Sequence, residues 1–345
     1  MTTSDAGGKV LHWGVLGATS YIATHLMPAI AQTPGCELAA VASRPEHAYR
    51  AGEVAQAHGA VAHQDYGSLV DDPRIDVVYI ALPNSEHISW TVRALEKGRH
   101  VLVEKPMAMG EDGCARIEEA ARVASRTVME AFMYRFHPQQ RRAAELLASG
   151  AIGELRVVRA CFAHGIESGS GNIRLEPSLG GGATWDVGCY AVDVPLLFFG
   201  REPERVSARF SRRPGTGVET SAVATMDFGD GRSAVIDYSI DYGPRAWYEL
   251  QGTQGTITVR NAWAMADEDG EITVLTADGV HHETIPAANH YQLQVASFAR
   301  AVREETTPLV TLADSRRTAR EGAALVTSAA AGGVITLGAA ATQAL

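Results

Sequence analysis

The chain has 345 residues, more than most single hydrophobic cores accommodate, so two domains are expected. Apolar residues make up 46% and charged residues 20% of the sequence, as in ordinary globular proteins. The formal net charge of −10 argues against a nucleic-acid-binding protein but does not exclude a local basic pocket for an anion. No apolar run is long enough to span a bilayer, and residues 1–9 lack the apolar core of a signal peptide. We therefore expect a cytoplasmic protein that binds neither nucleic acid nor membrane.

The four cysteines are widely spaced along the chain and form no CxxC motif. This spacing favours reduced thiols over a disulfide framework or a zinc site, and we predict no metal centre. The cysteines are Cys36, Cys114, Cys161 and Cys189.

The first part of the chain alternates predicted strands with predicted helices. Alternation of this kind predicts a parallel, doubly wound sheet, which we assign to a Rossmann domain over residues 1–130. The predicted strands cover residues 10–16, 37–42, 75–82 and 128–131, together with an apolar run that begins at His100.

A small-residue turn follows the first predicted strand and precedes a helix, which is the arrangement that binds the phosphates of a dinucleotide. Ser20 and Ala23 stand where further glycines are expected after Gly17. Small residues still allow a pyrophosphate to approach; the alternative is a tight turn with no ligand. The candidate phosphate-binding residues are Gly17, Ala18, Thr19, Ser20, Tyr21 and Ile22.

The second predicted strand ends in Ser43-Arg44. Sites that prefer NAD place an acid here for the ribose 2′-hydroxyl, whereas a hydroxyl and a guanidinium suit the 2′-phosphate of NADP. Arg50, on the helix that follows, adds positive charge. We therefore predict NADP in preference to NAD; the alternative is that Arg44 only caps the loop and that Glu46 binds the ribose.

The strand predicted over 75–82 ends in Leu82-Pro83-Asn84, and a helix follows it. Ligands of open α/β sheets bind at the carboxyl ends of the strands, so we assign Leu82, Pro83 and Asn84 to the cofactor site. His87 belongs to the same segment, and we include it among the candidate cofactor-binding residues. We expect it in the first helical turn, contacting this loop rather than acting as a catalyst.

The apolar run from His100 leads into Glu104-Lys105-Pro106. A short continuous apolar run is typical of a buried strand in a parallel sheet, so Glu104 and Lys105 are expected at its carboxyl end. This position places Lys105 at the mouth of the cofactor cleft, fixed by the stiff proline that follows. The alternative is a surface Glu–Lys pair that closes a strand.

The second part, residues 131–345, reads mainly as an antiparallel sheet with hairpin turns, which predicts an α+β substrate-binding and oligomerisation domain. The closing helices over 290–330 are candidates to pack back on the first domain. The predicted strands cover residues 155–163, 206–210, 222–227, 233–240, 247–251, 256–259 and 272–275.

A triple glycine, Gly180 to Gly182, precedes a predicted helix that carries Asp186 and Tyr190. Residues four apart share a helix face, and glycines allow the backbone to approach a ligand closely. The alternative is an N-terminal Asp favoured by the helix dipole beside an ordinary packing tyrosine.

Three motifs together resemble the Gfo/Idh/MocA oxidoreductase family: Glu104-Lys105-Pro106, Pro83-Asn84 with His87, and the glycine run followed by Asp186 and Tyr190. The resemblance covers essentially the full chain. It implies that Lys105 and Asp186 are catalytic-site residues and that the protein is a homodimer or homotetramer. Tyr190 resembles the subgroup of glucose–fructose oxidoreductase, dimeric dihydrodiol dehydrogenase and D-xylose dehydrogenase, whose members often use NADP.

We hypothesise that Tyr190 is the proton donor and acceptor of the reaction. A free tyrosine titrates near pH ~10, and an adjacent Lys105 ammonium would stabilise the phenolate. Asp186 would orient the substrate or the lysine. Arg135, His137 and Arg174 are candidate substrate binders, with a structural role as the alternative for each.

We therefore expect an NADP-dependent oxidoreductase that acts on a carbohydrate hydroxyl or carbonyl carbon. Two other enzymes fit the same residues: a ketoreductase of a nucleotide-linked deoxysugar and a trans-dihydrodiol dehydrogenase. A dinucleotide-binding sensor is the non-enzyme alternative, and the intact set of Lys105, Asp186 and Tyr190 argues against it.

Overall fold

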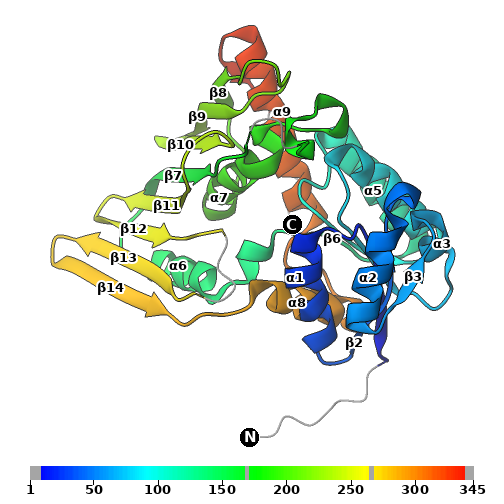
Figure 1. The fold of residues 1–345 in the computed structure, drawn as a ribbon. Helices are drawn as coiled ribbons and strands as arrows, with labels where there is room; N and C mark the ends of the chain where they lie inside the picture. The colour runs from blue at the N-terminus through cyan, green and yellow to red at the C-terminus, as the bar shows by residue number, and fades with distance from the viewer. Residues whose placement is uncertain (1–8, 168–170, 264–267, 339–345) are drawn as a thin grey trace, which may run out of the picture. The chain divides into compact units, whose positions relative to one another are not determined.

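The computed structural model describes residues 9–167, 171–263 and 268–338. Within them the chain divides into two compact units, each built around one sheet (Figure 1). The first unit contains the residues up to Met107, Gly113–Met133 and Asn289–Leu312. The second contains Ala108–Asp112, Tyr134–Ala288 and the residues from Ala313 onward.

The first unit holds a six-stranded sheet in the order β3-β2-β1-β4-β5-β6, and every pairing in it is parallel. This strand order is that of a doubly wound dinucleotide-binding sheet, which confirms the predicted Rossmann architecture. The strands are β1 (Leu11–Leu16), β2 (Cys36–Ala42), β3 (Val61–His63), β4 (Val77–Ile80), β5 (His100–Val103) and β6 (Val128–Glu130).

Helices cover the sheet of the first unit. α1 packs on β2 and on the late helix α8, and α4 packs on β4 and β5. All four residues of β4 are buried, as expected for a central strand of a parallel sheet that is covered on both faces. The helices of this unit are α1 (Ser20–Gln32), α2 (Ala48–His58), α3 (Tyr66–Asp71), α4 (His87–Glu96), α5 (Glu111–Ala124) and α8 (His290–Glu304).

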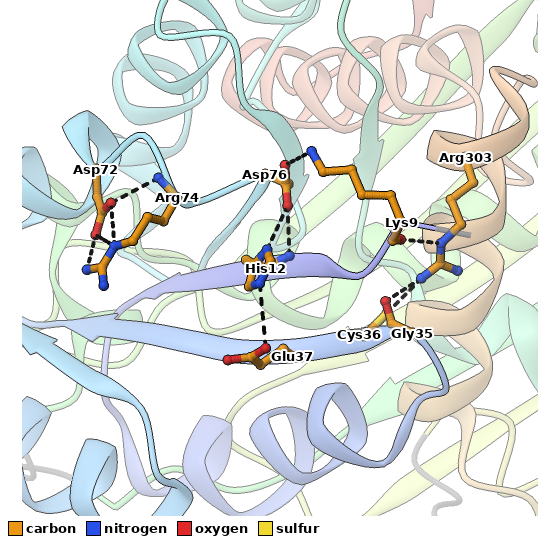
Figure 2. A network of polar contacts seen from close by, with 9 residues as sticks. All are labelled: Lys9, His12, Gly35, Cys36, Glu37, Asp72, Arg74, Asp76 and Arg303. Atoms are coloured by element: carbon orange, nitrogen blue, oxygen red, sulfur yellow. Dashed lines mark hydrogen bonds and ion pairs between the residues drawn. The ribbon is translucent and has the colours of Figure 1, made fainter. Parts of the chain in front are cut away.

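Polar contacts close the amino-terminal edge of this sheet (Figure 2). Asp76, just before β4, accepts hydrogen bonds from the backbone N–H of His12 at 3.0 Å and from Lys9 Nζ at 2.6 Å. Arg303 of α8 donates to the carbonyl oxygens of Gly35 and Lys9. These contacts link the first residues of the strands to α8 at this edge. The loops that follow the strands lie at the opposite, carboxyl edge of the sheet.

The second unit holds a nine-stranded sheet in the order β14-β13-β12-β11-β7-β10-β9-β8-β15. Only the β7–β10 pairing among these strands is parallel, so the predicted, mainly antiparallel sheet is confirmed. The strands are β7 (Leu155–Ala163), β8 (Arg205–Ser211), β9 (Ser221–Gly229), β10 (Arg232–Ser239), β11 (Arg245–Gly252), β12 (Gly255–Arg260), β13 (Gly270–Thr276), β14 (Gly279–Ile285) and β15 (Ile335–Thr336).

On this sheet, α7 (Cys189–Phe199) contacts β7 and β10, and α6 (Pro138–Ala148) contacts β12 and β13 (Figure 1). Of the two closing helices, α8 belongs to the first unit, whereas nearly all of α9 (Leu312–Ala331) belongs to the second. No helix within the described ranges is both long enough and apolar enough to cross a membrane.

Candidate active site

The predicted phosphate loop lies between β1 and α1 in the first unit. Gly17 has φ +103°, and a side chain there would overlap the carbonyl oxygen of Ala81, so glycine is required at this position. Thr19 caps α1 by accepting the N–H of Ile22 at 3.4 Å. The first N–H groups of a helix have no acceptor within the helix, so the turn that begins at Ser20 suits an anion.

Tyr291 supports this loop from α8. Its hydroxyl is hydrogen-bonded to that of Tyr21, and the two rings meet edge to face with their centroids 6.2 Å apart. His25 stacks on Tyr291 at 5.9 Å. The partner of Tyr21 is 270 residues away along the chain, so sequence patterns near the loop could not identify it.

The two residues of the predicted 2′-phosphate site, which follow β2, differ in exposure. Ser43 is buried, and its hydroxyl donates to the carbonyl oxygen of His47 at 2.7 Å. Arg44 is partly exposed and forms an ion pair with Glu86, which raises the pKa of its guanidinium. Arg44 is therefore the group of this pair that is available to a phosphate, whereas Ser43 is engaged within the protein.

The Glu104-Lys105-Pro106 segment follows β5 and is held at several points. Tyr79 of β4 donates its hydroxyl to the Glu104 carboxylate, which also accepts the N–H of Lys105 at 3.3 Å. The N–H of Met107 donates to Glu130 at 2.8 Å. The backbone that carries Lys105 is thus fixed on both sides.

His87 connects the two loops that follow β4 and β5. Its Nε2 lies 2.8 Å from the carbonyl oxygen of Leu82, and its Nδ1 lies 2.8 Å from that of Pro106. Burial lowers the pKa of His87, and the two carbonyl contacts oppose this shift. The ring is fully buried in the first turn of α4, where it was expected, and these contacts link it to the protein's own loops.

Asp186 is the centre of a polar cluster in the second unit. Its carboxylate is buried and lies 2.7 Å from Arg174 Nε and 3.1 Å from His164 Nε2. The side chains of Arg174 and His164 are 43% and 38% exposed, so solvent reaches both of these residues beside the buried Asp186 carboxylate. His164 follows β7 and was missed by the sequence analysis; its place at a strand end is the only local signal for it.

The triple glycine serves the protein's own packing. A Cβ on Gly181 would lie 2.6 Å from the carbonyl oxygen of Arg174, and one on Gly182 would overlap the Glu219 carboxylate. Gly182 also donates its N–H to Arg174 O at 2.9 Å. The space that Gly181 and Gly182 free is filled by the Arg174 backbone and the Glu219 carboxylate, so the protein's own packing requires glycine at these two positions.

Tyr190 lies in an aromatic cluster of the second unit and is nearly buried. Its ring centroid is 5.2 Å from that of Phe162, 5.7 Å from that of Tyr134 and 5.7 Å from that of Trp263. The residue lies in the first turn of α7, which directly follows a π-helical turn over Thr184–Gly188 that contains Asp186. The cluster fixes the direction of the phenol ring.

Arg135 and His137 are enclosed in the second unit. Asp193 binds the guanidinium of Arg135, and Asp314 lies 3.4 Å from it. Burial opposes the charge of Arg135, but Asp193 raises its pKa above the usual value. His137 caps α6 by accepting the N–H of Gln139 at 3.3 Å. These contacts favour the structural role for both residues over substrate binding.

No cluster of metal-ligating side chains occurs among the residues that the structure describes. The residues present are instead those that suit a dinucleotide: a tight glycine turn before α1 and a partly exposed cation, Arg44, after β2.

Two family models match the chain. The model for the "oxidoreductase family, NAD-binding Rossmann fold" (GFO_IDH_MocA) matches residues 11–132, and the "GFO/IDH/MocA C-terminal domain" matches residues 140–258. Among curated relatives, D-xylose 1-dehydrogenase (NADP(+)) 2 of Haloferax volcanii is 36% identical over 94% of this chain and 99% of its own length. A dTDP-3,4-didehydro-2,6-dideoxy-alpha-D-glucose 3-reductase of Streptomyces violaceoruber is 32% identical over 86% of each chain.

A solved structure with the same fold is that of a 3-ketoreductase from Actinomadura kijaniata in complex with NADP and TDP-benzene. It superposes with a TM-score of 0.88 at 29% identity and covers 92% of this chain and 97% of its own. Together with the doubly wound sheet of the first unit and the large antiparallel sheet of the second, these matches show that the chain belongs to the Gfo/Idh/MocA family of oxidoreductases.

Proposed function

We propose that this protein is an NADP-dependent oxidoreductase that transfers a hydride between the nicotinamide and a hydroxyl or carbonyl carbon of a carbohydrate, as an aldose dehydrogenase does. The observation that carries the proposal is the Lys105 segment, which Tyr79, His87 and Glu130 fix at the carboxyl edge of the sheet. Ligands of such sheets bind at that edge. The similarity to a D-xylose dehydrogenase over nearly the whole chain supports the substrate class.

The residues that would hold NADP come from three loops of the first unit. The turn from Gly17 to Ser20 would receive the pyrophosphate, Arg44 the 2′-phosphate, and the loop around Asn84 the central part of the dinucleotide. When bound, the nicotinamide supplies the acceptor or donor of the hydride. The protein must then place the reacting carbon and move one proton.

In this proposal Tyr190 moves that proton. In oxidation the phenol oxygen of Tyr190 takes the proton of the substrate hydroxyl, and in reduction it returns a proton to the carbonyl oxygen. The Lys105 ammonium stabilises the phenolate and donates a hydrogen bond to the reacting oxygen. The aromatic contacts of Tyr190 restrict its ring to one orientation, which supports a positioned acid and base.

In this proposal Asp186 positions the residues that bind the substrate. Its buried carboxylate holds Arg174 and His164, whose exposed edges can bind sugar hydroxyls. The proposal therefore retains Arg174 and Asp186 as substrate-site residues and adds His164. Arg135 and His137 are left out because their side chains serve packing and capping.

A second candidate function is reduction of the keto group of a nucleotide-linked deoxysugar. It is supported by the similarity to the Streptomyces violaceoruber 3-reductase and to the Actinomadura kijaniata structure with TDP-benzene. Lys105 and Tyr190 would also serve this reaction, because reduction of a ketone is the reverse of oxidation of an alcohol and uses the same proton transfer.

The test is steady-state turnover of the purified protein with NADP(H) and NAD(H) on a panel of free aldoses, dTDP-linked ketosugars and a trans-dihydrodiol. The proposal predicts reduction of NADP by an aldose, with a kcat/KM for NADP at least 10-fold above that for NAD. Turnover of the dTDP-ketosugar alone would establish the second candidate. Binding of the dinucleotide without turnover of any panel member would contradict both and favour a sensor.

A further inference from the structure

An ion pair joins two strand ends in the first unit. Arg44 follows β2, and Glu86 lies in the short 3-10 turn (Asn84–Glu86) that follows β4. In the sheet, β2 and β4 flank β1, which leads into the turn at Gly17. The Arg44–Glu86 pair therefore joins loops on either side of the predicted phosphate turn, at the edge where a dinucleotide would bind.

Glu86 is held by two partners. One carboxylate oxygen accepts the guanidinium of Arg44, and the other accepts the indole N–H of Trp90 at 3.3 Å. The side chain of Glu86 is 26% exposed and that of Arg44 is 37% exposed, so solvent reaches both groups. A fixed carboxylate thus lies directly against Arg44, which is partly exposed, whereas the neighbouring Ser43 is buried.

This arrangement treats the two dinucleotides differently. The 2′-phosphate of NADP is an anion that must share Arg44 with the Glu86 carboxylate, and like charges so close repel each other. The ribose 2′-hydroxyl of NAD carries no charge and can donate a hydrogen bond to a carboxylate. Ser43 and Arg44 stand at the end of β2, where NAD-preferring sites place an acid, and Glu86 supplies an acid from the turn after β4.

We propose that Glu86 is a specificity-determining residue that weakens the binding of NADP through its hold on Arg44 and gives NAD an acceptor for its 2′-hydroxyl. The inference rests on the proposed cofactor site and adds to it a residue that limits the preference for NADP. It further predicts measurable binding of NAD, although Ser43-Arg44 alone favours NADP.

The experiment measures the dissociation constants of NADPH and NADH by fluorescence titration of the full chain. Glu86→Gln removes the charge and keeps a side-chain oxygen for the indole N–H of Trp90. The expected result is about 10-fold tighter binding of NADPH and NADH binding that is unchanged or up to about 5-fold weaker. A 10-fold change corresponds to about 1.4 kcal/mol.

Glu96→Gln is the matched control, because it makes the same change of net charge at an exposed acid at the far end of α4, in the same unit. It is expected to change NADPH binding by less than 2-fold. If Glu86→Gln leaves the NADPH dissociation constant unchanged or raises it, the inference is overturned. An equal effect of both variants also overturns it, because net charge rather than the ion pair would then explain the change.

Arg44→Gln separates this inference from the proposed cofactor site. If Arg44→Gln weakens NADPH binding at least 10-fold while Glu86→Gln has no effect, only the role of Glu86 fails. If Arg44→Gln leaves NADPH binding unchanged, Arg44 does not bind the 2′-phosphate, and the cofactor site itself is wrong. Thermal unfolding of each variant shows whether the fold is intact.

Discussion

The imidazole of His87 lies 2.8 Å from the carbonyl oxygen of Pro106, 19 residues further along the chain. Its other ring nitrogen lies 2.8 Å from the carbonyl oxygen of Leu82. A single buried side chain thus joins the loop after β4 to the segment that carries Lys105. Two of the motifs that identify the family are parts of one hydrogen-bonded unit.

His87→Leu tests this connection, since it keeps much of the side-chain volume and removes both polar contacts of the ring. The carbonyl oxygen that accepts the ring N–H would lose its donor, which is expected to lower the free energy of unfolding by about 1–3 kcal/mol. Urea denaturation measures the change. His281→Leu, at an exposed site on β14, should change stability by less than about 0.5 kcal/mol. An equally small effect of His87→Leu would mean that the two loops do not depend on this residue.

Gly181→Ala tests the role of the triple glycine. The added methyl group would lie 2.6 Å from the carbonyl oxygen of Arg174, so the backbone of one segment must shift, at a cost of about 1–3 kcal/mol. Gly243→Ala is the control because a Cβ there meets no atom within 4 Å. Thermal unfolding should show a lower midpoint for Gly181→Ala alone; equal midpoints would show that the segment around Arg174 adapts freely.

The sequence predicted the Rossmann sheet well because its buried strands are continuous apolar runs, as in β4 (Val77–Ile80). Strands with little burial escaped prediction. β3 has three residues, of which two are exposed and His63 is half-buried, and four of the seven residues of β14 (Gly279–Ile285) are exposed in succession. Neither strand shows the alternation that marks a half-buried strand, and β15 has only two residues.

The candidate site was predicted where its residues lie in short motifs and missed where partners are distant. Nothing near Gly182 indicates that Glu219 fills the space beside it, and nothing near Asp186 indicates His164, 22 residues earlier. Arg135 was expected to bind substrate, but its ion pair with Asp193, 58 residues later, depends on the tertiary fold. Such contacts depend on which distant segments the fold brings together, and the residues that neighbour them in sequence do not indicate them.

His164→Ala tests the substrate cluster. The buried Asp186 carboxylate would lose one of the two partners described for it here, and hydrogen bonds to charged groups contribute about 1.5–3 kcal/mol. The expected result is a kcat/KM about 10- to 100-fold lower, with the dissociation constant of NADPH unchanged. His282→Ala, at an exposed site, is the control. Unchanged kcat/KM in His164→Ala would remove this residue from the substrate site.

Glu321 of α9 predicts a pH dependence of stability. The side chain is fully buried, and among the described residues neither carboxylate oxygen has a hydrogen-bond partner. Burial raises its pKa to about 8; Arg320 opposes the shift, whereas Glu202 and Glu111 add to it. The folded state therefore binds this proton more tightly than the unfolded state does. The stabilisation of the folded state by this bound proton is complete below pH ~4.5 and is lost as the pH rises through about 8.

Glu321→Gln should abolish this loss. Between pH 5 and pH 9 the wild-type protein is expected to lose up to about 4 kcal/mol of unfolding free energy that the variant retains. Urea denaturation at several pH values measures the difference. Glu304→Gln, at an exposed position of α8, should follow the wild-type curve. Parallel curves for wild type and Glu321→Gln would show that the carboxyl is not protonated in the folded protein at neutral pH.

The catalytic proposal is tested most directly by the turnover number of Tyr190→Phe and Lys105→Met with the preferred sugar, measured beside their NADPH dissociation constants. Tyr242→Phe and Lys97→Met, at exposed sites, are the controls. The account predicts that each catalytic variant loses about 10²- to 10⁴-fold in kcat while NADPH binding changes by less than about 3-fold. Near-wild-type kcat in both variants, with cofactor binding intact, would contradict it.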